Sequence, residues 1–298
     1  MISYGKTEWI PQMKALWHQT FGDDEQYLEA FFSKIYQDEN TLVYVLDKKV
    51  AAILFMIPYQ YRHDGTEEEA VYLYALATAP KYRGQTIMTR LIHKSIEISR
   101  QRGYAAMILI PSEKTLFNYY SRFGFQTCSD MVKVNKSRHE VHEQTKTKNI
   151  LQAQEGTRPP INLMSASKQQ LWNAYKNSEY YDKNGILLSE EQNAFYYNEL
   201  IKEGGEGFVF DLHDRLDGYV LLKYEHPVLE IYETNIDKDN LVFLYQALEE
   251  KYQYNRLIFY QPVCFDEAEI KQNRQEFAMA LSLRENSLSE IFINRVLM

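Results

Sequence analysis

Cysteine is scarce in this chain of 298 residues. Only Cys128 and Cys264 occur, and they lie far apart without the spacing of metal ligands. This excludes a disulfide framework and a cysteine-based zinc motif. We therefore expect a protein of a reducing cytoplasm and predict no metal site.

Long apolar runs are also absent. No segment approaches the roughly 20 apolar residues that a membrane-spanning helix needs. The first residues, from Met1 to Lys6, contain no apolar signal region. The sequence predicts a soluble cytoplasmic protein without a membrane partner.

Basic residues are outnumbered by acidic ones. The chain has 33 Lys and Arg against 41 Asp and Glu, which gives a formal net charge of −8. No long basic run occurs, so we exclude nucleic acid as the main partner. An acidic surface suits a cationic or amine substrate, but only weakly.

The length favours two domains, because single hydrophobic cores stop growing at about this size. Residues 136–160 are polar and charged and predict a linker or crossover. We therefore expect one domain in residues 1–135 and a second in residues 161–298. In both, the pattern predicts an α/β (α+β) fold with a mixed, largely antiparallel sheet flanked by helices.

The stretch from Val71 to Phe125 has the clearest pattern in the chain. It predicts a buried strand, a tight basic turn, a long helix, a second buried strand and a short helix. The turn contains Pro80 and Gly84, and Gly103 is placed to end the long helix. The first strand is residues 71–77, the turn residues 78–85 and the second strand residues 105–110. Apolar residues from Ile87 to Ile98 indicate the long helix, and Leu116, Phe117 and Tyr120 indicate the short helix, which Gly124 ends.

A turn from a strand into a helix can bind an anion. The first N–H groups of the helix have no partner within it, and the helix dipole adds partial positive charge there. Arg83 adds a full charge, and Lys81 and Arg90 lie close by in the sequence. This arrangement predicts a site for a pyrophosphate group.

Two motifs in this stretch resemble a known family. Pro80-Lys-Tyr-Arg-Gly-Gln-Thr-Ile-Met-Thr-Arg-Leu91 resembles the acyl-CoA-binding motif of the GCN5-related N-acetyltransferases (GNAT). Tyr119-Tyr-Ser-Arg-Phe-Gly-Phe125 resembles the family's later Tyr-x-x-x-Gly-Phe motif. The sequences of both motifs are most similar to those of the Eis-like (enhanced intracellular survival) branch. The resemblance implies the GNAT fold in two tandem copies, and we expect this chain to lack the branch's third, sterol-carrier-like domain.

The chain departs from the family motif at two positions. Thr86 stands where the family has its first glycine, and Met88 stands where it has glycine or alanine. Glycine lets a phosphate approach the backbone closely, whereas a Cβ at residue 86 could narrow the site. The hydroxyl of Thr86 could instead donate to a phosphate oxygen. Weakened cofactor binding therefore remains open.

The resemblance also implies roles for individual residues. Leu76, Ala77 and Thr78 would offer backbone groups to the pantetheine arm of acetyl-CoA, and Ser112 would border its other side with Glu113. Tyr120 matches the general acid that protonates the departing CoA thiolate. The pyrophosphate would be held by Arg83, Gly84, Gln85, Thr86, Ile87 and Met88.

Each candidate also has a structural interpretation. Taken alone, Arg83 and Lys81 would be surface charges and Tyr120 a core ring. The acidic run Glu67–Glu69 is typical of a solvated turn, although one of its carboxylates could deprotonate an amine through water. His63 and His93 are interpreted as surface histidines.

The second half repeats the element order of the first without obvious sequence identity. Its turn at Glu233–Asn240 has no Gly-rich basic sequence, and Asp237 and Asp239 would repel phosphate. We expect a degenerate, structural GNAT-like copy. Residues 265–283 are predicted to be partly helical, and residues 290–297 are predicted to form a final strand.

The resulting hypothesis is an N-acetyltransferase, an acyltransferase that moves an acetyl group from acetyl-CoA to an amine of a small molecule or peptide. The alternative is a non-catalytic acyl-CoA-binding or protein-interaction module with a decayed site. Aminoacyl transfer from tRNA is a weaker option, and the acidic net charge argues against it. The acceptor, the general base and the oligomeric state are not encoded in a recognisable way.

Overall fold

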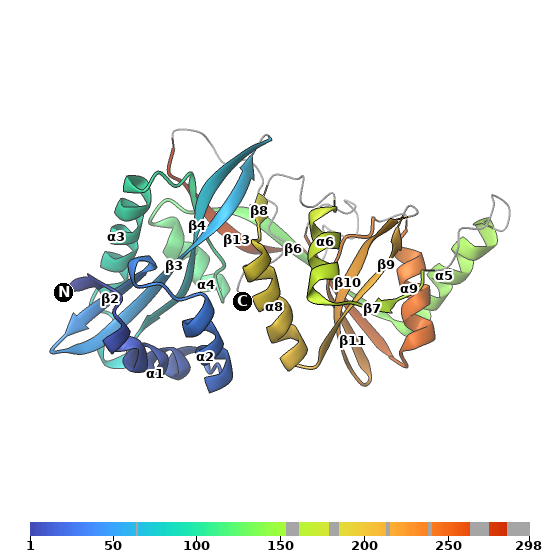
Figure 1. Ribbon diagram of the computed structural model, residues 1–298, viewed down its shortest axis with the longest axis horizontal. Helices are drawn as coiled ribbons and strands as arrows, with labels where there is room; N and C mark the ends of the chain where they lie inside the picture. Colours follow the sequence, from blue (N-terminus) through green and yellow to red (C-terminus); the bar gives the residue numbers. More distant parts are fainter. Residues whose placement is uncertain are drawn as a thin grey trace. The chain divides into compact units, whose positions relative to one another are not determined.

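The computed structural model describes residues 1–63, 65–152, 161–178, 185–212, 215–237, 240–262 and 274–284. The chain divides into two compact units (Figure 1). Unit 1 comprises Met1–Ser129, Asn184–Gln192 and Phe277–Met298, and unit 2 comprises Asp130–Lys183 and Asn193–Glu276. Among the described residues, no helix is both long and apolar enough to cross a membrane.

Unit 1 is a sheet with helices on both faces. Its strand order is β1-β2-β3-β4-β5-β13, and β8 pairs with β3. All of these pairs are antiparallel except β4 with β5. The elements are β1 Ile2–Tyr4, η1 Thr7–Trp9, α1 Ile10–Phe21, α2 Glu25–Lys34, η2 Asp38–Asn40, β2 Thr41–Leu46, β3 Lys49–His63, β4 Thr66–Thr78, η3 Pro80–Tyr82, α3 Ile87–Gln101, β5 Ala106–Leu109, α4 Lys114–Ser121, β8 Gly185–Leu187 and β13 Arg274–Ser282.

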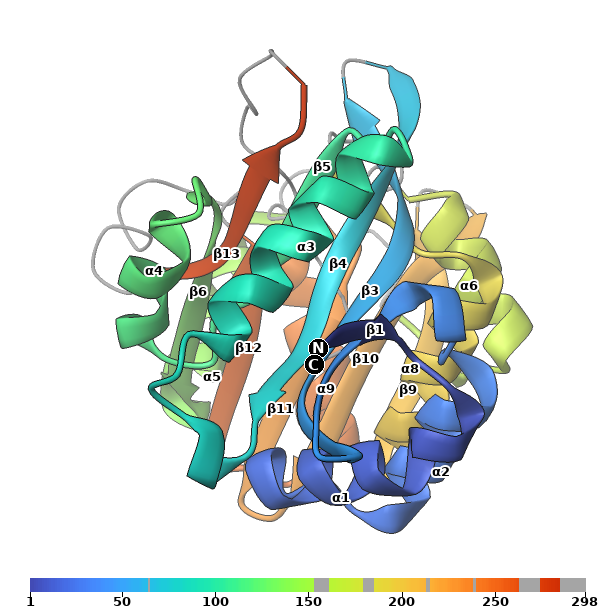
Figure 2. The ribbon, with the colours of Figure 1, turned by 90° about the vertical axis from the view of Figure 1, so that its left-hand side faces the viewer.

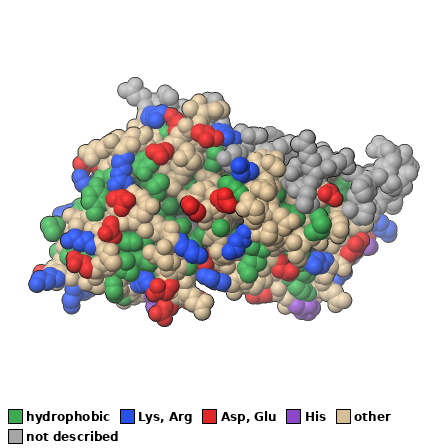
Figure 3. Space-filling model, viewed as in Figure 1, with side chains coloured by type: hydrophobic (Ala, Val, Ile, Leu, Met, Phe, Trp, Pro, Cys, Tyr) green, Lys and Arg blue, Asp and Glu red, His purple; other side chains and the backbone are tan. Residues whose placement is uncertain are grey.

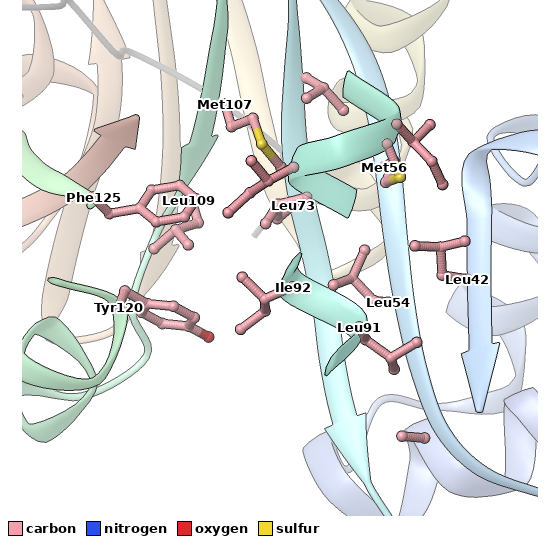
Figure 4. Close-up of a cluster of buried hydrophobic side chains, with 14 of the residues drawn as sticks. Leu42, Leu54, Met56, Leu73, Leu91, Ile92, Met107, Leu109, Tyr120 and Phe125 are labelled. Carbon is pink, nitrogen blue, oxygen red and sulfur yellow. The ribbon is translucent and has the colours of Figure 1, made fainter. Parts of the chain in front are cut away.

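Alternation along β3 separates the two cores of unit 1. Leu54 and Met56 pack in an aliphatic core with α3, whereas Phe55 packs against Trp17 and Phe31 of α1 and α2. Successive strand residues point to opposite faces, so one strand serves both cores. Figure 2 shows α3 lying across the strands of this sheet, and Figure 4 shows the aliphatic core.

The strands of unit 2 follow the order β6-β12-β11-β10-β9-β7. Strands β11 and β12 are parallel, and the other described pairs of this unit are antiparallel. Its aliphatic core includes Val141 of α5 and Leu244 and Leu248 of α9. The elements are β6 Gln126–Ser137, which begins in unit 1, α5 Arg138–Gln152, β7 Met164–Ser165, α6 Lys168–Lys176, α8 Glu190–Lys202, β9 Gly205–Leu212, β10 Arg215–Glu225, β11 Val228–Thr234, α9 Leu241–Lys251 and β12 Arg256–Pro262.

In both units the strand pairing is mixed and largely antiparallel, with flanking helices, which confirms the predicted fold class. On the face drawn in Figure 3, the side chains of Lys and Arg are interspersed with those of Asp and Glu. The units differ from the predicted domains, because residues 184–192 and 277–298 belong to unit 1. The boundary at Ser129 falls inside β6 rather than in the predicted linker at 136–160.

Three local predictions need correction. The predicted linker contains helix α5. Its sequence is polar, but the side chain of Val141 is fully buried. The predicted helix in residues 265–283 is wrong over Arg274–Ser282, where β13 pairs with β5 and tertiary pairing overrides helix propensity. Strand β8 was not predicted at all. The predicted strand at residues 290–297 and Cys264 lie outside the described residues, whereas Cys128 is a buried free thiol.

Candidate functional site

Strands β4 and β5 are paired over only a short ladder. Residues Ala70 to Tyr72 of β4 pair with Ala106 to Ile108 of β5. Strand β4 continues to Thr78, whereas β5 ends at Leu109. Within the part of the chain that is described, residues 73–78 therefore have a ladder partner on the β3 side alone. The open edge of β4 faces away from β3.

A β-bulge lies in this open part of β4. The register with β3 shifts between the pairs Ile53–Ala77 and Phe55–Tyr74, which inserts an extra residue into β4. Ala75 has a φ of +47°, a conformation that alanine rarely adopts. Bulges interrupt the ladder and redirect backbone groups, and such strain concentrates at functional sites.

The residue before the bulge is held from one side of the sheet. The ring of Tyr74 lies 5.4 Å from that of Trp17, centroid to centroid, and 5.8 Å from that of Phe31. Its hydroxyl is 2.7 Å from the hydroxyl of Tyr27. These contacts fix the backbone beside Ala75 against α1 and α2.

The turn after β4 places the predicted phosphate-binding residues together. Leu76, Ala77 and Thr78 end β4, one residue later than predicted. Thr86 is the N-cap of α3, and its carbonyl accepts a hydrogen bond from the N–H of Arg90 at 3.1 Å. No side chain caps the helix, so the N–H groups of its first turn can donate to an anion.

The backbone of the turn is left-handed at two positions. Gly84 has a φ of +75° and Thr86 a φ of +59°. This explains why glycine suits position 86, since a β-branched residue pays a steric cost for the same conformation. The turn has this conformation although residue 86 is threonine and not the glycine of the family motif. The side chain of Thr86 is exposed.

Positive charge surrounds the turn. The Nε of Arg83 donates to the carbonyl oxygen of Thr78 at 3.1 Å, which holds this exposed guanidinium over the turn. The Nζ of Lys81 lies 4.4 Å from the centre of the Tyr82 ring. The structure brings together all six predicted residues: Arg83, Gly84, Gln85 and Thr86 are exposed, Ile87 is buried and Met88 is half-buried.

Tyr120 is buried in the aliphatic core beside α3. Its side chain is 7 % exposed, and its ring lies 6.2 Å from that of Phe125 (Figure 4). No described residue hydrogen-bonds its hydroxyl. Burial, and secondarily Tyr119, raises the pKa of Tyr120 well above its usual value. The hydroxyl is therefore protonated at neutral pH and can donate that proton.

The remaining predicted residues lie near the second strand or at the far end of the first. Ser112 is exposed between β5 and α4, and Glu113 accepts a hydrogen bond from Thr115 Oγ1 at 2.6 Å. Glu67 forms an ion pair with Arg62, and Glu68 forms one with Arg284.

Strand geometry separates the acidic run from the bulge. At a rise of roughly 3.3 Å per residue, Glu69 is about 20 Å from Ala75 along β4. The structure therefore favours the solvated interpretation of Glu67–Glu69. His93 is exposed beside the ring of Phe123, as predicted, and the side chain of His63 lies outside the described ones.

Sequence reasoning missed the tyrosines around the bulge. Burial raises the pKa of Tyr72 well above its usual value, and Tyr59, Tyr27 and Tyr120 raise it further. The hydroxyl groups of these residues are therefore close enough to interact. The alternation of Tyr72 and Tyr74 in a run otherwise composed of aliphatic residues was the available signal.

The corresponding turn of unit 2 has a different chemistry. The carboxylate of Asp237 accepts a hydrogen bond from the N–H of Asn240 at 3.0 Å, directly before α9. Asp239 lies outside the described residues. Within those residues, His, Cys, Asp and Glu side chains form no group of three or more that could hold a metal ion.

Replacing Thr86 with glycine is expected to stabilise the chain by about 1 kcal/mol, because glycine adopts the left-handed conformation without steric cost. Urea unfolding of the two proteins measures the difference. Thr86→Ala is the control and should gain much less, since alanine keeps the Cβ. A destabilised glycine variant would contradict the observed backbone conformation.

The chain is expected to lose stability above a pH of about 10, where tyrosines of an unfolded chain deprotonate. Burial raises the pKa of Tyr72, Tyr74 and Tyr120, so the folded chain keeps protons that the unfolded chain releases. Stability is unchanged below that pH and falls above it by about 1.4 kcal/mol per pH unit for each such residue. Urea unfolding between pH 8 and 10.5 tests this, and Tyr74→Phe should make the decline shallower. A flat profile would contradict the burial of these hydroxyls.

Comparisons with known proteins agree with this geometry. Residues 2–128 match the family model of the acetyltransferase (GNAT) domain. The comparison with curated protein sequences gave no match. Among solved structures, a conserved protein of unknown function from Enterococcus faecalis V583, described as a probable N-acyltransferase, has a TM-score of 0.76 at 12% identity, covering 95% of this chain and 72% of that one.

Two further structures are similar over 95% of this chain. A GCN5-related N-acetyltransferase from Kribbella flavida has a TM-score of 0.69 at 13% identity and is covered over 72% of its length. Eis1 from Mycobacterium abscessus has a TM-score of 0.69 at 11% identity and is covered over 74%. At these identities, the likeness concerns the fold.

Proposed function

We propose that the chain, whose residues 2–128 match the family model of the acetyltransferase (GNAT) domain, transfers an acetyl group from acetyl-CoA to an amine of a small molecule or peptide. One observation carries this proposal. The open edge of β4, with its bulge at Ala75, leads through the turn at residues 79–86 into the uncapped first turn of α3. Strand β4 would thereby supply the backbone group that polarises the thioester carbonyl, and it leads to the turn that would bind the diphosphate.

The residues of unit 1 suit acetyl-CoA, which supplies the acyl group as a reactive thioester. The N–H groups at the start of α3 and the guanidinium of Arg83 would hold the diphosphate. Backbone groups of Leu76, Ala77 and Thr78 on the open edge would hold the pantetheine arm. Thr86 has the left-handed backbone conformation that a glycine would adopt there, and its side chain is exposed.

Catalysis would then rest on positioning and on two polar groups. A backbone N–H released at the bulge would polarise the thioester carbonyl and stabilise the charge that develops on its oxygen. The Tyr120 hydroxyl would donate its proton to the departing thiolate sulfur. The amine must be neutral and held near the carbonyl carbon, which supplies much of the rate.

We also propose that unit 2 is a second, degenerate copy, and that the chain is related to the Eis-like branch. The succession β10-β11-α9-β12 repeats β3-β4-α3-β5, with a parallel final pair in each. The pairing of β11 with β10 also has a register shift, which lies between Leu221 and Leu222 of β10. The carboxylate of Asp237 stands before α9, where it would repel a phosphate.

Calorimetric titration with acetyl-CoA tests the proposal, followed by thiol release with a panel of amines. We expect binding of one acetyl-CoA per chain and turnover of at least one amine. Binding without turnover would favour a non-catalytic acyl-CoA-binding module, and no binding would favour a protein-interaction module. Either result would contradict the proposed transfer.

A further inference from the structure

Strand β5 pairs on one side with a segment from the far end of the chain. Its ladder with β4 ends at Ile108, before its last residue. On the other side, Ala106 to Leu109 pair antiparallel with Met279 to Ser282 of β13. The N–H of Leu283 then donates to the carbonyl oxygen of Ala105 at 3.0 Å. All residues of β5 thus pair with β13 (Figure 2).

Strand β13 also packs against the core that contains Tyr120. Met279 is 2 % exposed and belongs to the same buried cluster as Tyr120 and Phe125. Leu281 and Leu283 pack against that cluster from its edge. The side chains of β13 therefore support both the strand and the helix that border the proposed acyl site.

Leu281 touches the turn that ends the helix of Tyr120. Its Cδ1 lies 3.2 Å from the position that a Cβ on Gly124 would occupy. Gly124 has a φ of +92°, and its N–H donates to the carbonyl oxygen of Ser121 at 3.0 Å. The N–H of Phe123 donates to the carbonyl oxygen of Tyr120 at 3.0 Å. The backbone conformation favours glycine at this position of the Tyr-x-x-x-Gly-Phe motif, and a Cβ there would press against the methyl group of Leu281.

We infer that β13 completes the acyl-transfer site of unit 1 and that Leu281 is a positioning residue for Tyr120. This inference rests on the proposed function. A small displacement of a catalytic group can cost on the order of 10²-fold in rate. Loss of the Leu281 contact would let the turn at Gly124 and the hydroxyl of Tyr120 move without altering the turn that holds the diphosphate.

The test uses the full chain with 3-fluorotyrosine at position 120 and compares Leu281→Ala with Leu248→Ala. Leu248 is fully buried in α9 of unit 2, whereas Leu281 is half-buried, so Leu248→Ala is a control with at least as large a loss of core packing elsewhere. We expect Leu281→Ala to shift the fluorine resonance and to speed amide exchange in residues 106–125. Leu248→Ala should do neither, and Leu281→Met should restore both because it conserves volume.

Kinetics with the amine found by the panel complete the test. Leu281→Ala should lower kcat by on the order of 10–100-fold while the KM for acetyl-CoA stays within about threefold. An unchanged fluorine resonance would overturn the inference, and so would a shifted resonance with unchanged kcat. If the unaltered chain turned over no amine, the proposed function would fail, whereas resonance and exchange would still decide whether β13 holds Tyr120.

Discussion

Replacing Tyr120 with phenylalanine is expected to lower kcat by on the order of 10²–10⁴-fold. The variant lacks the hydroxyl that donates a proton to the departing thiolate, and the raised pKa of Tyr120 keeps that proton in place at neutral pH. The affinity for acetyl-CoA should stay nearly unchanged, because Tyr120 lies in the core and not in the turn at residues 83–88. Steady-state kinetics and calorimetric titration measure the two effects separately.

Tyr119→Phe is the matched control for this prediction. Tyr119 precedes Tyr120 on α4 and is half-buried, with its ring 5.3 Å from that of Tyr120. Its substitution should leave kcat and acetyl-CoA affinity unchanged. If Tyr120→Phe instead abolished binding with little change in the turnover of bound substrate, Tyr120 would be a structural ring and not the acid.

Replacing Thr86 with aspartate is expected to weaken acetyl-CoA binding by at least on the order of 10²-fold, through repulsion between like charges a few ångströms apart. The fold should not suffer. Aspartate tolerates a positive φ better than a β-branched residue, and a carboxylate is favourable at a helix N-terminus. The variant therefore separates stability, which stays equal or rises, from binding, which is lost.

Thr86→Asn is the control, because asparagine has the same shape and backbone preference as aspartate without its charge. Calorimetric titration of both variants with acetyl-CoA, beside their urea unfolding curves, checks the prediction. Equal binding by the aspartate variant would mean that no phosphate approaches residue 86. Weak binding by both variants would indicate a steric cause and not an electrostatic one.

Local patterns predicted the elements from β4 to α4 because each of them has a strong signal of its own. The apolar run that forms β4 and the helical spacing that forms α3 both act over short sequence distances. The turn at residues 83–88 was also predictable. A family motif, a strand before it and a helix after it all indicate the same place.

Features that depend on distant partners were not predictable. The bulge at Ala75 is fixed by rings on α1 and α2, and nothing in the alanine itself marks it. Strand β13 is rich in residues that favour helices, and it is extended because β5 lies beside it. The tyrosines around the bulge could not be singled out in the sequence, because the chain has 24 tyrosines in all.

A crystal structure of the chain with acetyl-CoA tests the central claim most directly. We expect oxygen atoms of the coenzyme's diphosphate within hydrogen-bond distance of backbone N–H groups in residues 83–88, with the thioester beside Ala75. A diphosphate bound elsewhere, or a turn closed to it by the side chain of Thr86, would contradict the account.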